Sequence, residues 1–248
     1  MTAISANSTV ANRRVAVTGA ASGIGAATAR LLAQQGWRVA CLDRNLAGAR
    51  ATGGASGVAV EVDVADEASV LRAFKEVDAA FGGLDALVTA AGIINTTAFF
   101  ETTVAEFRKL FDVNVIGSFL TVREAAKYMQ NGARICMVAS ISSYTGGGYV
   151  ARGAYATSKG AVLTMMKSCA RELGSKGIAV NAVAPGFIDT PFVASAMSDP
   201  KRRKEVEAAV GKVGTAEQIA ECAAFLVSPA AGFVHGETLI ADGGILMR

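Results

Sequence analysis

Tyr155 and Lys159 stand four residues apart in a segment that is typical of a helix, and together they could move a proton. Residues at positions i and i+4 share one face of a helix, so the phenol and the ammonium would be neighbours. A neighbouring cation favours the phenolate and lowers a tyrosine pKa from about 10 toward neutrality. Such a phenol could serve as general acid and base for an alcohol hydroxyl or a ketone oxygen. Alone, this spacing is more typical of a surface pair, so the interpretation depends on other residues.

Serines and one asparagine are candidates to accompany this pair. Ser140, Ser142 and Ser143 follow an apolar run that is typical of a strand, and a glycine-rich loop comes after them. Asn114 interrupts an apolar helical pattern, and asparagine is a poor former of helix interiors, so its presence there needs a reason. The residues by themselves indicate only that a serine at the end of this strand could take part.

Arg13–Arg30 has the pattern of a short buried strand, a glycine turn and an alanine-rich helix. Gly19 can make the tight turn, Gly23 leaves room for a pyrophosphate beside the backbone, and Gly25 lets the helix pack closely. The free N–H groups at the start of that helix form an anion site. Many helix entrances contain glycine, so the turn needs support from the residues that follow it.

That support comes from Trp37–Asp43, a second apolar run that ends on an acid 18 residues after Gly25. A carboxylate at this place can accept hydrogen bonds from an adenosine ribose, and it repels a 2′-phosphate. Alternatively, Asp43 merely begins a turn with Asn45. Arg44 could pair with a phosphate, but the carboxylate stands first and the glycine turn holds no Lys or Arg. The sequence therefore predicts NAD as the cofactor, with NADP as the less favoured choice.

Strand and helix patterns alternate along the chain with short loops, which predicts an α/β fold with a parallel sheet covered by helices on both faces. We expect a flexible tail at residues 1–12, one domain at 13–248, and a mobile flap over the substrate at about 187–212. The Gly/Ala-rich segment 47–57 is expected to connect strands without a clear helix. The remaining expected elements are strands at 58–64, 84–89, 134–140, 178–184 and 238–241, and helices at 66–81, 103–129, 154–173 and about 215–227.

Composition excludes several classes of protein. The 248 residues suit one domain, and a net charge of +3 without a basic block argues against nucleic acid as a partner. Four scattered cysteines are expected to be free thiols, and a single histidine, His235, argues against a metal cluster. No apolar run suggests a signal peptide or a membrane span, so we expect a cytoplasmic protein. The apolar composition, 52%, hints at faces buried between subunits.

Together these features resemble the short-chain dehydrogenase/reductase family over about residues 13–245. The motifs that carry the resemblance are Thr18–Gly25, Asp63, Asn114, the strand-end serine, Tyr155 with Lys159, Pro185-Gly186 with Thr190, and Asp242-Gly243-Gly244. The resemblance implies a doubly wound Rossmann domain with a seven-stranded parallel sheet, hydride transfer to or from a nicotinamide, and a homotetramer.

The resemblance also implies roles for single residues. Tyr155 would be the acid/base, Lys159 would lower its pKa and hold the nicotinamide ribose, and Asn114 would hold a water in a proton relay. The serine would polarise the substrate oxygen. The family's commoner spacing to Tyr155 would select Ser142, whereas aligning the strand places Ser140 in the catalytic position. We expect Ser140, because strand register fixes a position more firmly than loop length does. The expected cofactor contacts are Gly19, Ser22, Gly23, Ile24, Gly25, Asp43, Arg44, Asp63, Val64, Ala91, Gly92, Tyr155, Lys159, Pro185, Gly186, Ile188 and Thr190.

The sequence departs from the family after the fourth strand, where Thr89-Ala90-Ala91-Gly92 replaces a common Asn-Asn-Ala-Gly. We expect cofactor binding to survive, since Ala91 and Gly92 still offer backbone. The predicted activity is interconversion of a small or medium-sized secondary alcohol and its ketone with NAD(H). The alternatives are a 3-oxoacyl thioester reductase, many of which use NADPH, and a non-catalytic NAD-binding sensor or scaffold.

Two further features have simpler interpretations. His235 is expected to be a turn or interface residue. Lys201–Lys204 is expected to be a solvated helical face, unless the flap closes and Lys201 and Arg202 attract an acidic substrate.

Overall fold

The structure is a computed structural model, and it describes residues 12–54, 57–148, 150–194 and 200–247. Seven parallel strands form one sheet in the order β3-β2-β1-β4-β5-β6-β9, which confirms the predicted doubly wound α/β fold. The strands are β1 Arg14–Thr18, β2 Arg38–Asp43, β3 Val58–Glu61, β4 Leu84–Thr89, β5 Met129–Val138, β6 Ala179–Pro185 and β9 Thr238–Ala241. The predicted tail at 1–12 lies outside the described residues, except for Asn12.

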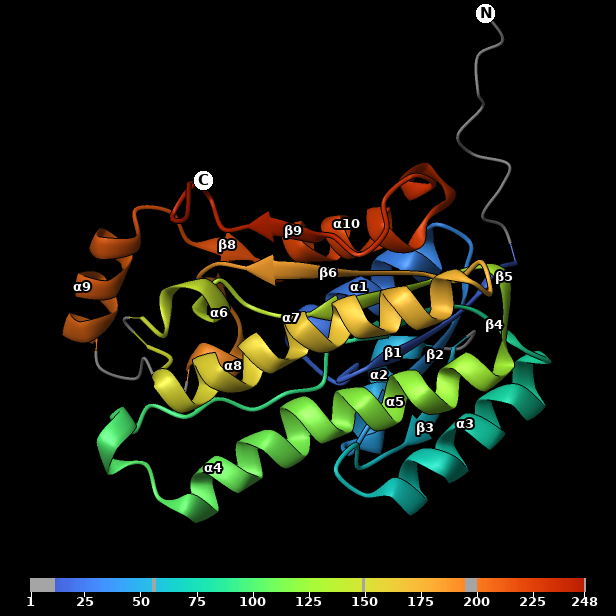
Figure 1. Cartoon of the computed structure of the whole chain (residues 1–248), viewed down its shortest axis with the longest axis horizontal. Coiled ribbons are helices and arrows are strands. Elements are labelled where there is room, and N and C mark those ends of the chain that lie inside the picture. Colours follow the sequence, from blue (N-terminus) through green and yellow to red (C-terminus); the bar gives the residue numbers. More distant parts are fainter. Residues whose placement is uncertain (1–11, 55–56, 149, 195–199, 248) are drawn as a thin grey trace, which may run out of the picture.

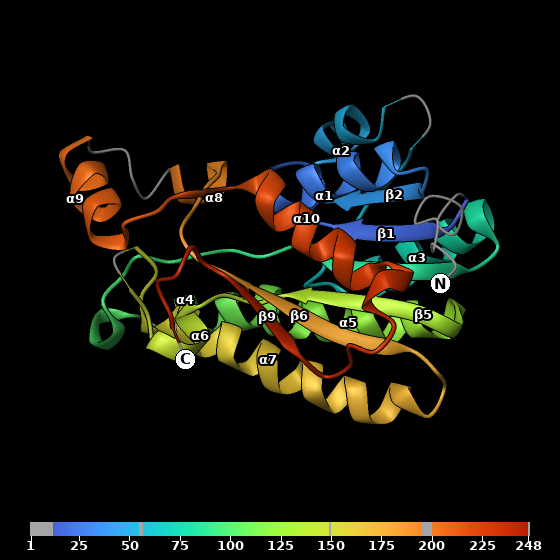
Figure 2. The same ribbon diagram turned by 90° about the horizontal axis from the view of Figure 1, so that it is seen from above.

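Helices cover both faces of this sheet (Figures 1 and 2). One face carries α1 (Gly23–Gln34) and α10 (Ala216–Val227), and the other carries α3 (Glu67–Phe81), α5 (Gly117–Ala125) and α7 (Gly153–Gly174). Because the strands β1, β2, β4 and β6 are buried on both faces over most of their length, their residues are apolar nearly throughout, as parallel sheets require. This continuous apolarity is the pattern from which the strands were predicted.

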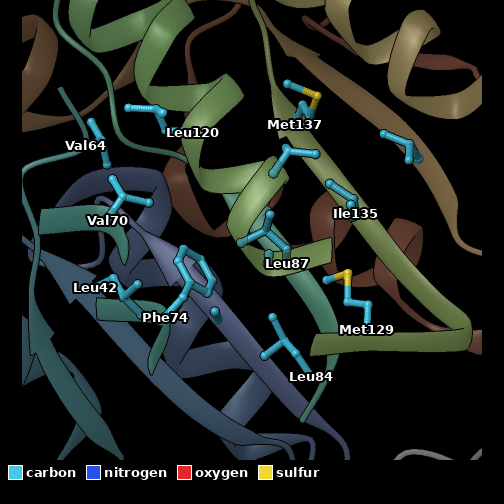
Figure 3. Packing of buried hydrophobic residues seen from close by; sticks show 14 of the residues in the cluster. Leu42, Val64, Val70, Phe74, Leu84, Leu87, Leu120, Met129, Ile135 and Met137 are labelled. Carbon is cyan, nitrogen blue, oxygen red and sulfur yellow. The ribbon is translucent and has the colours of Figure 1, made fainter. Parts of the chain in front are cut away.

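The two faces have separate cores because side chains alternate along each strand. In β1, Val15 and Val17 belong to the core under α1 and α10, and Ala16 belongs to the opposite core. Phe74 of α3 packs in that opposite core with Leu42 and Leu87 (Figure 3). These contacts fix the strand ends, and therefore the loops that follow them.

Helix starts agree with the predicted caps. The Asp66 carboxylate accepts a hydrogen bond from the backbone N–H of Ala68 at 3.1 Å and caps α3. Thr215 and Gln218 form the predicted capping box of α10, in which each side chain accepts from the other's backbone N–H.

The sequence missed one helix and misplaced the ends of two strands. Residues 47–57 were expected to lack a helix, yet α2 spans Leu46–Gly53, where Asn45 caps the helix and Ala49 is fully buried. The glycines hid this helix, and Gly48 is needed because a Cβ there would lie 2.7 Å from that of Ala21. Strand β3 ends at Glu61 instead of residue 64, and β5 begins at Met129 instead of residue 134.

The helical region expected at 103–129 is present but is not uniform. It consists of α4 (Val104–Phe111), a π-helical turn (Asp112–Ile116), α5 and a short 3₁₀ turn (Ala126–Tyr128). The π turn holds Asn114, and π turns are frequent at functional sites. The unexplained asparagine therefore coincides with a local change of helix geometry.

The segment between β6 and α10 begins and ends in a small parallel sheet, in which β7 (Ile188–Asp189) pairs with β8 (Gly214–Thr215). Between them, α8 (Pro191–Ala194) and α9 (Pro200–Val210) lie at one end of the molecule (Figure 1). Val206 of α9 packs against Val150 in a small cluster. The segment thus covers the loop that follows the short helix α6 (Ser142–Thr145).

Candidate active site

A cavity of about 900 Å³ opens at the carboxyl ends of the parallel strands. The strand order reverses between β1 and β4, and α/β sheets bind ligands outside the strand ends at this point. Every predicted cofactor contact borders the cavity, as do Ser140 and Ser142. Asn114 is the exception among the candidate catalytic residues, since it does not border the cavity.

The glycine turn gives the cavity a backbone wall. Gly19 and Gly23 have φ of +69° and +53°, where side chains are rarely tolerated, and a Cβ on Gly25 would lie 2.2 Å from the Gly19 carbonyl oxygen. Ser22 is the N-cap of α1, but its side chain makes no capping hydrogen bond, and the first helical turn holds no acid. The start of α1 therefore offers a positive, uncapped end to an anion.

Asp43 is held in place by the turn that it faces. Its Oδ2 accepts from the backbone N–H of Ala21 at 3.0 Å, and its Oδ1 accepts from that of Asn45 at 2.8 Å. Arg44, beside it, is exposed. Asp63 borders the same end of the cavity, with its Oδ1 accepting from the N–H of Ala65 at 2.9 Å. Negative charge is thus fixed at this end, where an adenosine ribose would lie.

Tyr155, Ser140 and Lys159 meet at the other end of the cavity. All three are buried, and a hydrogen bond joins the Ser140 hydroxyl to the Tyr155 phenol. The Ser140 hydroxyl also accepts from the backbone N–H of Ser142 at 3.1 Å. Ser140 is thereby oriented by the backbone and hydrogen-bonded to the phenol, and its catalytic role stays a prediction.

Burial opposes the expected effect of Lys159 on the phenol. Burial raises the pKa of Tyr155 to about 12, although the hydrogen bond from Ser140 opposes this rise. Burial also lowers the pKa of Lys159 to about 8. The ammonium donates to the Val138 carbonyl at 2.8 Å and lies 6.0 Å from the phenol ring centroid. Loss of hydration thus outweighs the attraction between the two groups.

Asn114 is buried completely, and its side chain is engaged by the loop after β4. Its Oδ1 accepts from the Ile93 N–H at 2.8 Å, and its Nδ2 donates to the Ile93 carbonyl and to the Ser158 hydroxyl, both at 3.0 Å. A Cβ on Gly92 would lie 3.2 Å from this Oδ1 and 3.5 Å from Lys159 Nζ. Asn114 therefore joins the loop after β4 to α7; a part in a proton relay stays a prediction.

The segment that follows β6 forms another part of the cavity wall. Thr190 lies against the glycine turn, since a Cβ on Gly23 would be 3.6 Å from the Thr190 Cβ. Gly186 packs against the backbone of Asp242, because a Cβ on Gly186 would lie 2.6 Å from the Asp242 Cα. Asp242 accepts from the backbone N–H groups of Gly244 and Leu246, which brings Ile245 to the cavity.

Sequence reasoning missed the residues that line the cavity around Tyr155. They share no motif, and the fold alone brings them together: Ile93, Ile94, Val150, Ala151, Arg152, Phe187, Val193 and Ile245. Only Arg152 had an available signal, because it is a charged residue just before the predicted helix that holds Tyr155.

The remaining candidates have structural roles. His235 accepts from the Val180 N–H through Nδ1, so its Nε2–H faces the Ala170 carbonyl at 3.0 Å and ties β6 to α7. The four cysteines are free, and the described residues contain no metal-binding group of three or more ligands. Lys201 and Lys204 are exposed on α9, and Arg203 pairs with Asp189 and Glu207.

No helix within the described ranges has the length and apolarity that crossing a membrane requires.

A nucleotide-binding α/β sheet and a buried tyrosine–serine–lysine group define a class of oxidoreductase, and comparison with known proteins agrees. The family model described as enoyl-(acyl carrier protein) reductase matches residues 19–246. The chain belongs to the short-chain dehydrogenase/reductase family and is a nicotinamide-dependent oxidoreductase acting on CH–OH groups.

Among its curated relatives is cis-4-hydroxycyclohexanecarboxylate dehydrogenase of Sinomonas cyclohexanicum, 39% identical over 94% of this chain and 96% of the relative. The 2-(R)-hydroxypropyl-CoM dehydrogenase of Xanthobacter autotrophicus is 37% identical over 94% and 98%. A solved short-chain dehydrogenase/reductase from Brucella melitensis, titled glucose/ribitol dehydrogenase, superposes with a TM-score of 0.89 at 31% identity, covering 96% of this chain and 98% of that one.

Proposed function

We propose that the chain is an NAD(H)-dependent dehydrogenase of small or medium-sized secondary alcohols, in which Tyr155 is the general acid and base. The observation that carries the proposal is the direct contact between the buried Tyr155 phenol and the Ser140 hydroxyl at the end of the cavity opposite Asp43. A substrate oxygen placed against both hydroxyls would have a proton donor and a second polar group within reach.

The residues present fit a dinucleotide. The uncapped start of α1 suits the pyrophosphate, and a Cβ in the turn at Gly25 would collide with backbone. Asp43 suits a ribose diol, because both of its oxygens are held by backbone N–H groups and the residue borders the cavity. A 2′-phosphate would meet this fixed carboxylate, so we favour NAD over NADP.

When bound, NAD(H) would supply the hydride acceptor for oxidation and the hydride donor for reduction. During oxidation, the phenolate form of Tyr155 accepts the hydroxyl proton and later releases it to solvent, so that the alcohol yields its ketone and one proton while the hydride passes to the cofactor. During reduction, the phenol donates its proton to the carbonyl oxygen. With a pKa of about 12, the phenol is protonated at neutral pH and is ready for this second role. Ser140 orients the substrate oxygen, and Lys159 supplies a positive charge beside it.

The test combines dinucleotide binding with turnover. NAD⁺, NADH, NADP⁺ and NADPH are titrated against the purified protein, and alcohols and ketones are screened at 340 nm, beginning with cis-4-hydroxycyclohexanecarboxylate. Tyr155→Phe should abolish turnover and leave NAD(H) binding within about twofold, whereas the control Tyr128→Phe, away from the cavity, should retain both. Turnover by Tyr155→Phe would refute the assigned role.

Asp43 decides the cofactor in this proposal. Asp43→Asn should weaken the preference for NAD(H) over NADP(H) by roughly tenfold or more, since it removes one full charge beside the ribose. A wild-type preference for NADPH would favour the second candidate, a 3-oxoacyl thioester reductase, which the relatives named 3-oxoacyl-[acyl-carrier-protein] reductase support at 32–37% identity. Reduction of an acetoacetyl thioester separates the two.

Location and assembly belong to the same proposal. We place the enzyme in the cytoplasm as a homotetramer. Exposed apolar side chains support the assembly, among them Ile116 and Phe119 on the helical region after β4, with exposures of 45% and 43%. Sedimentation analysis at micromolar concentration tests it, and a monomer would exclude it.

A further inference from the structure

We propose that Arg152 binds an anionic group of the substrate, of the carboxylate or sulfonate class, and thereby makes this enzyme a hydroxy-acid dehydrogenase. The inference rests on the proposed function and adds its substrate class. Arg152 is the N-cap residue of α7, with extended backbone, three residues before Tyr155. Its exposed side chain borders the active-site cavity and also a second cavity of about 730 Å³ beside it.

Arg152 has a free charge. Within the described parts of the chain, its guanidinium makes neither a hydrogen bond nor an ion pair. A guanidinium presents five donors in a planar fork that matches a carboxylate or a sulfonate. The neighbouring wall offers no acid, since the residues that both cavities share are Ser142, Gly147, Gly148 and Arg152.

The charges of the cavity are divided between its two ends. Among the described residues, its charged side chains are Asp43, Arg44, Asp63, Arg152 and Lys159. Asp43 is the last residue of β2, whereas Ser140, which contacts Tyr155, follows β5, three strands away in the sheet. Neighbouring strands lie about 4.8 Å apart, so the ends are separated by roughly 14 Å, which exceeds a Debye length of about 8 Å. The substrate end is therefore positively charged.

The other cations near this end do not compete for a substrate anion. Lys159 is buried and donates to the Val138 carbonyl. On α9, Lys201 and Lys204 do not border the cavity, and Arg203 is paired with Asp189 and Glu207. The sequence offered this flap as a source of cations for an acidic substrate only as the alternative to a solvated face, whereas the structure places Arg152 at the cavity.

Arg152 and Tyr155 border the same cavity from the start of α7, Arg152 from the extended N-cap and Tyr155 from the first turn of the helix. The inference therefore places the carbinol at Tyr155 and the anionic group at Arg152. The cavity is also bordered by an apolar cluster with Ile94, Val150, Phe187 and Val193. A hydroxy acid with an apolar body matches this surface.

The experiment compares acids with their neutral amides on the NAD-loaded protein. The pair is cis-4-hydroxycyclohexanecarboxylate and its carboxamide, and kcat/KM is measured for wild type, Arg152→Gln, Arg152→Lys and the control Arg171→Gln. Arg171 is exposed on the same helix, 19 residues further on, and does not border either cavity.

Loss of a charge-assisted contact should lower kcat/KM for the acid by roughly 10- to 100-fold in Arg152→Gln. The amide should change less than about twofold, Arg152→Lys should recover part of the activity, and Arg171→Gln should resemble wild type. Equal loss for acid and amide, or a wild type that prefers the amide, would overturn the inference.

A binding measurement separates this inference from the proposed function. Cyclohexanecarboxylate, which has no hydroxyl, is titrated by calorimetry into the NADH-loaded protein and into its Arg152→Gln variant. Binding that the variant loses supports the anion site even if no alcohol is turned over. Turnover of neutral alcohols without any binding of the carboxylate would refute the anion site and leave the dehydrogenase activity standing.

Discussion

Removing the charge of Lys159 should change the way in which stability depends on pH. The side chain is 5% exposed, and burial lowers its pKa from 10.5 to about 8. In the unfolded chain the amine keeps a pKa of about 10.4. Between these two values the unfolded chain holds one proton more than the folded protein does. The free energy of unfolding must therefore rise with pH through this window.

The size of the effect follows from the shift. Each pH unit between the two pKa values adds about 1.4 kcal/mol to the free energy of unfolding. Of the range from pH 7.0 to 9.5, about 1.5 units lie above the folded pKa of about 8. The free energy of unfolding of the wild type should therefore rise by about 2 kcal/mol relative to that of Lys159→Met. Groups such as Cys136 and Tyr155 are present in both proteins, and their contributions cancel in the difference. Lys167→Met is the matched control, because Lys167 is exposed on the same helix.

Urea unfolding without cofactor provides the assay. Trp37, the only tryptophan, is 5% exposed and reports loss of the core by fluorescence. The difference in free energy of unfolding between wild type and Lys159→Met should grow with pH, whereas wild type and Lys167→Met should stay parallel. Parallel curves for Lys159→Met would refute the reasoning, because they would mean that the buried amine keeps an ordinary pKa.

Three further predictions follow from the site. Ser140→Ala should lower kcat by roughly 100-fold and Ser142→Ala by less than about tenfold, measured at saturating substrate, because the Ser140 hydroxyl is hydrogen-bonded to Tyr155; the reverse order would assign the role to Ser142. Asn114→Ala should lower the free energy of unfolding by about 2–4 kcal/mol, since it unpairs Ile93 and Ser158, whereas exposed Asn131→Ala should change it by under about 1 kcal/mol. Alcohol oxidation should increase as pH rises above 7, since it needs the phenolate and burial raises the pKa of Tyr155 to about 12; a rate that is flat from pH 6 to 9 would contradict this.

Much of the fold was available in the sequence because its signals are local. A strand buried on both faces must be apolar nearly throughout, and a cap such as Asp66 or Thr215 is a choice of side chain beside a helix start. The glycines of the turn after β1 are required by backbone contacts that only glycine allows. The alternation of these signals was enough to predict a parallel sheet with helices on both faces.

Other features depend on the neighbours that folding supplies. Helix α2 was missed because Gly48 lowers its helical signal, and only its contact with Ala21 explains the glycine. The π turn at Asn114 was equally hidden, since its amide is satisfied by Ile93 and Ser158, both far along the chain.

By itself, the sequence determined the order of elements, the glycine turn, the acid at the end of β2 and the pairing of Tyr155 with Lys159 on one helix, because each depends on residues near one another in the chain. Only the tertiary structure decided the protonation of that pair, since burial by distant segments removes the water that would stabilise either charge. It also decided which cation borders the cavity. Arg152 does and Lys201 does not, because the packing of loops from several strands defines the cavity, and no local pattern encodes that packing.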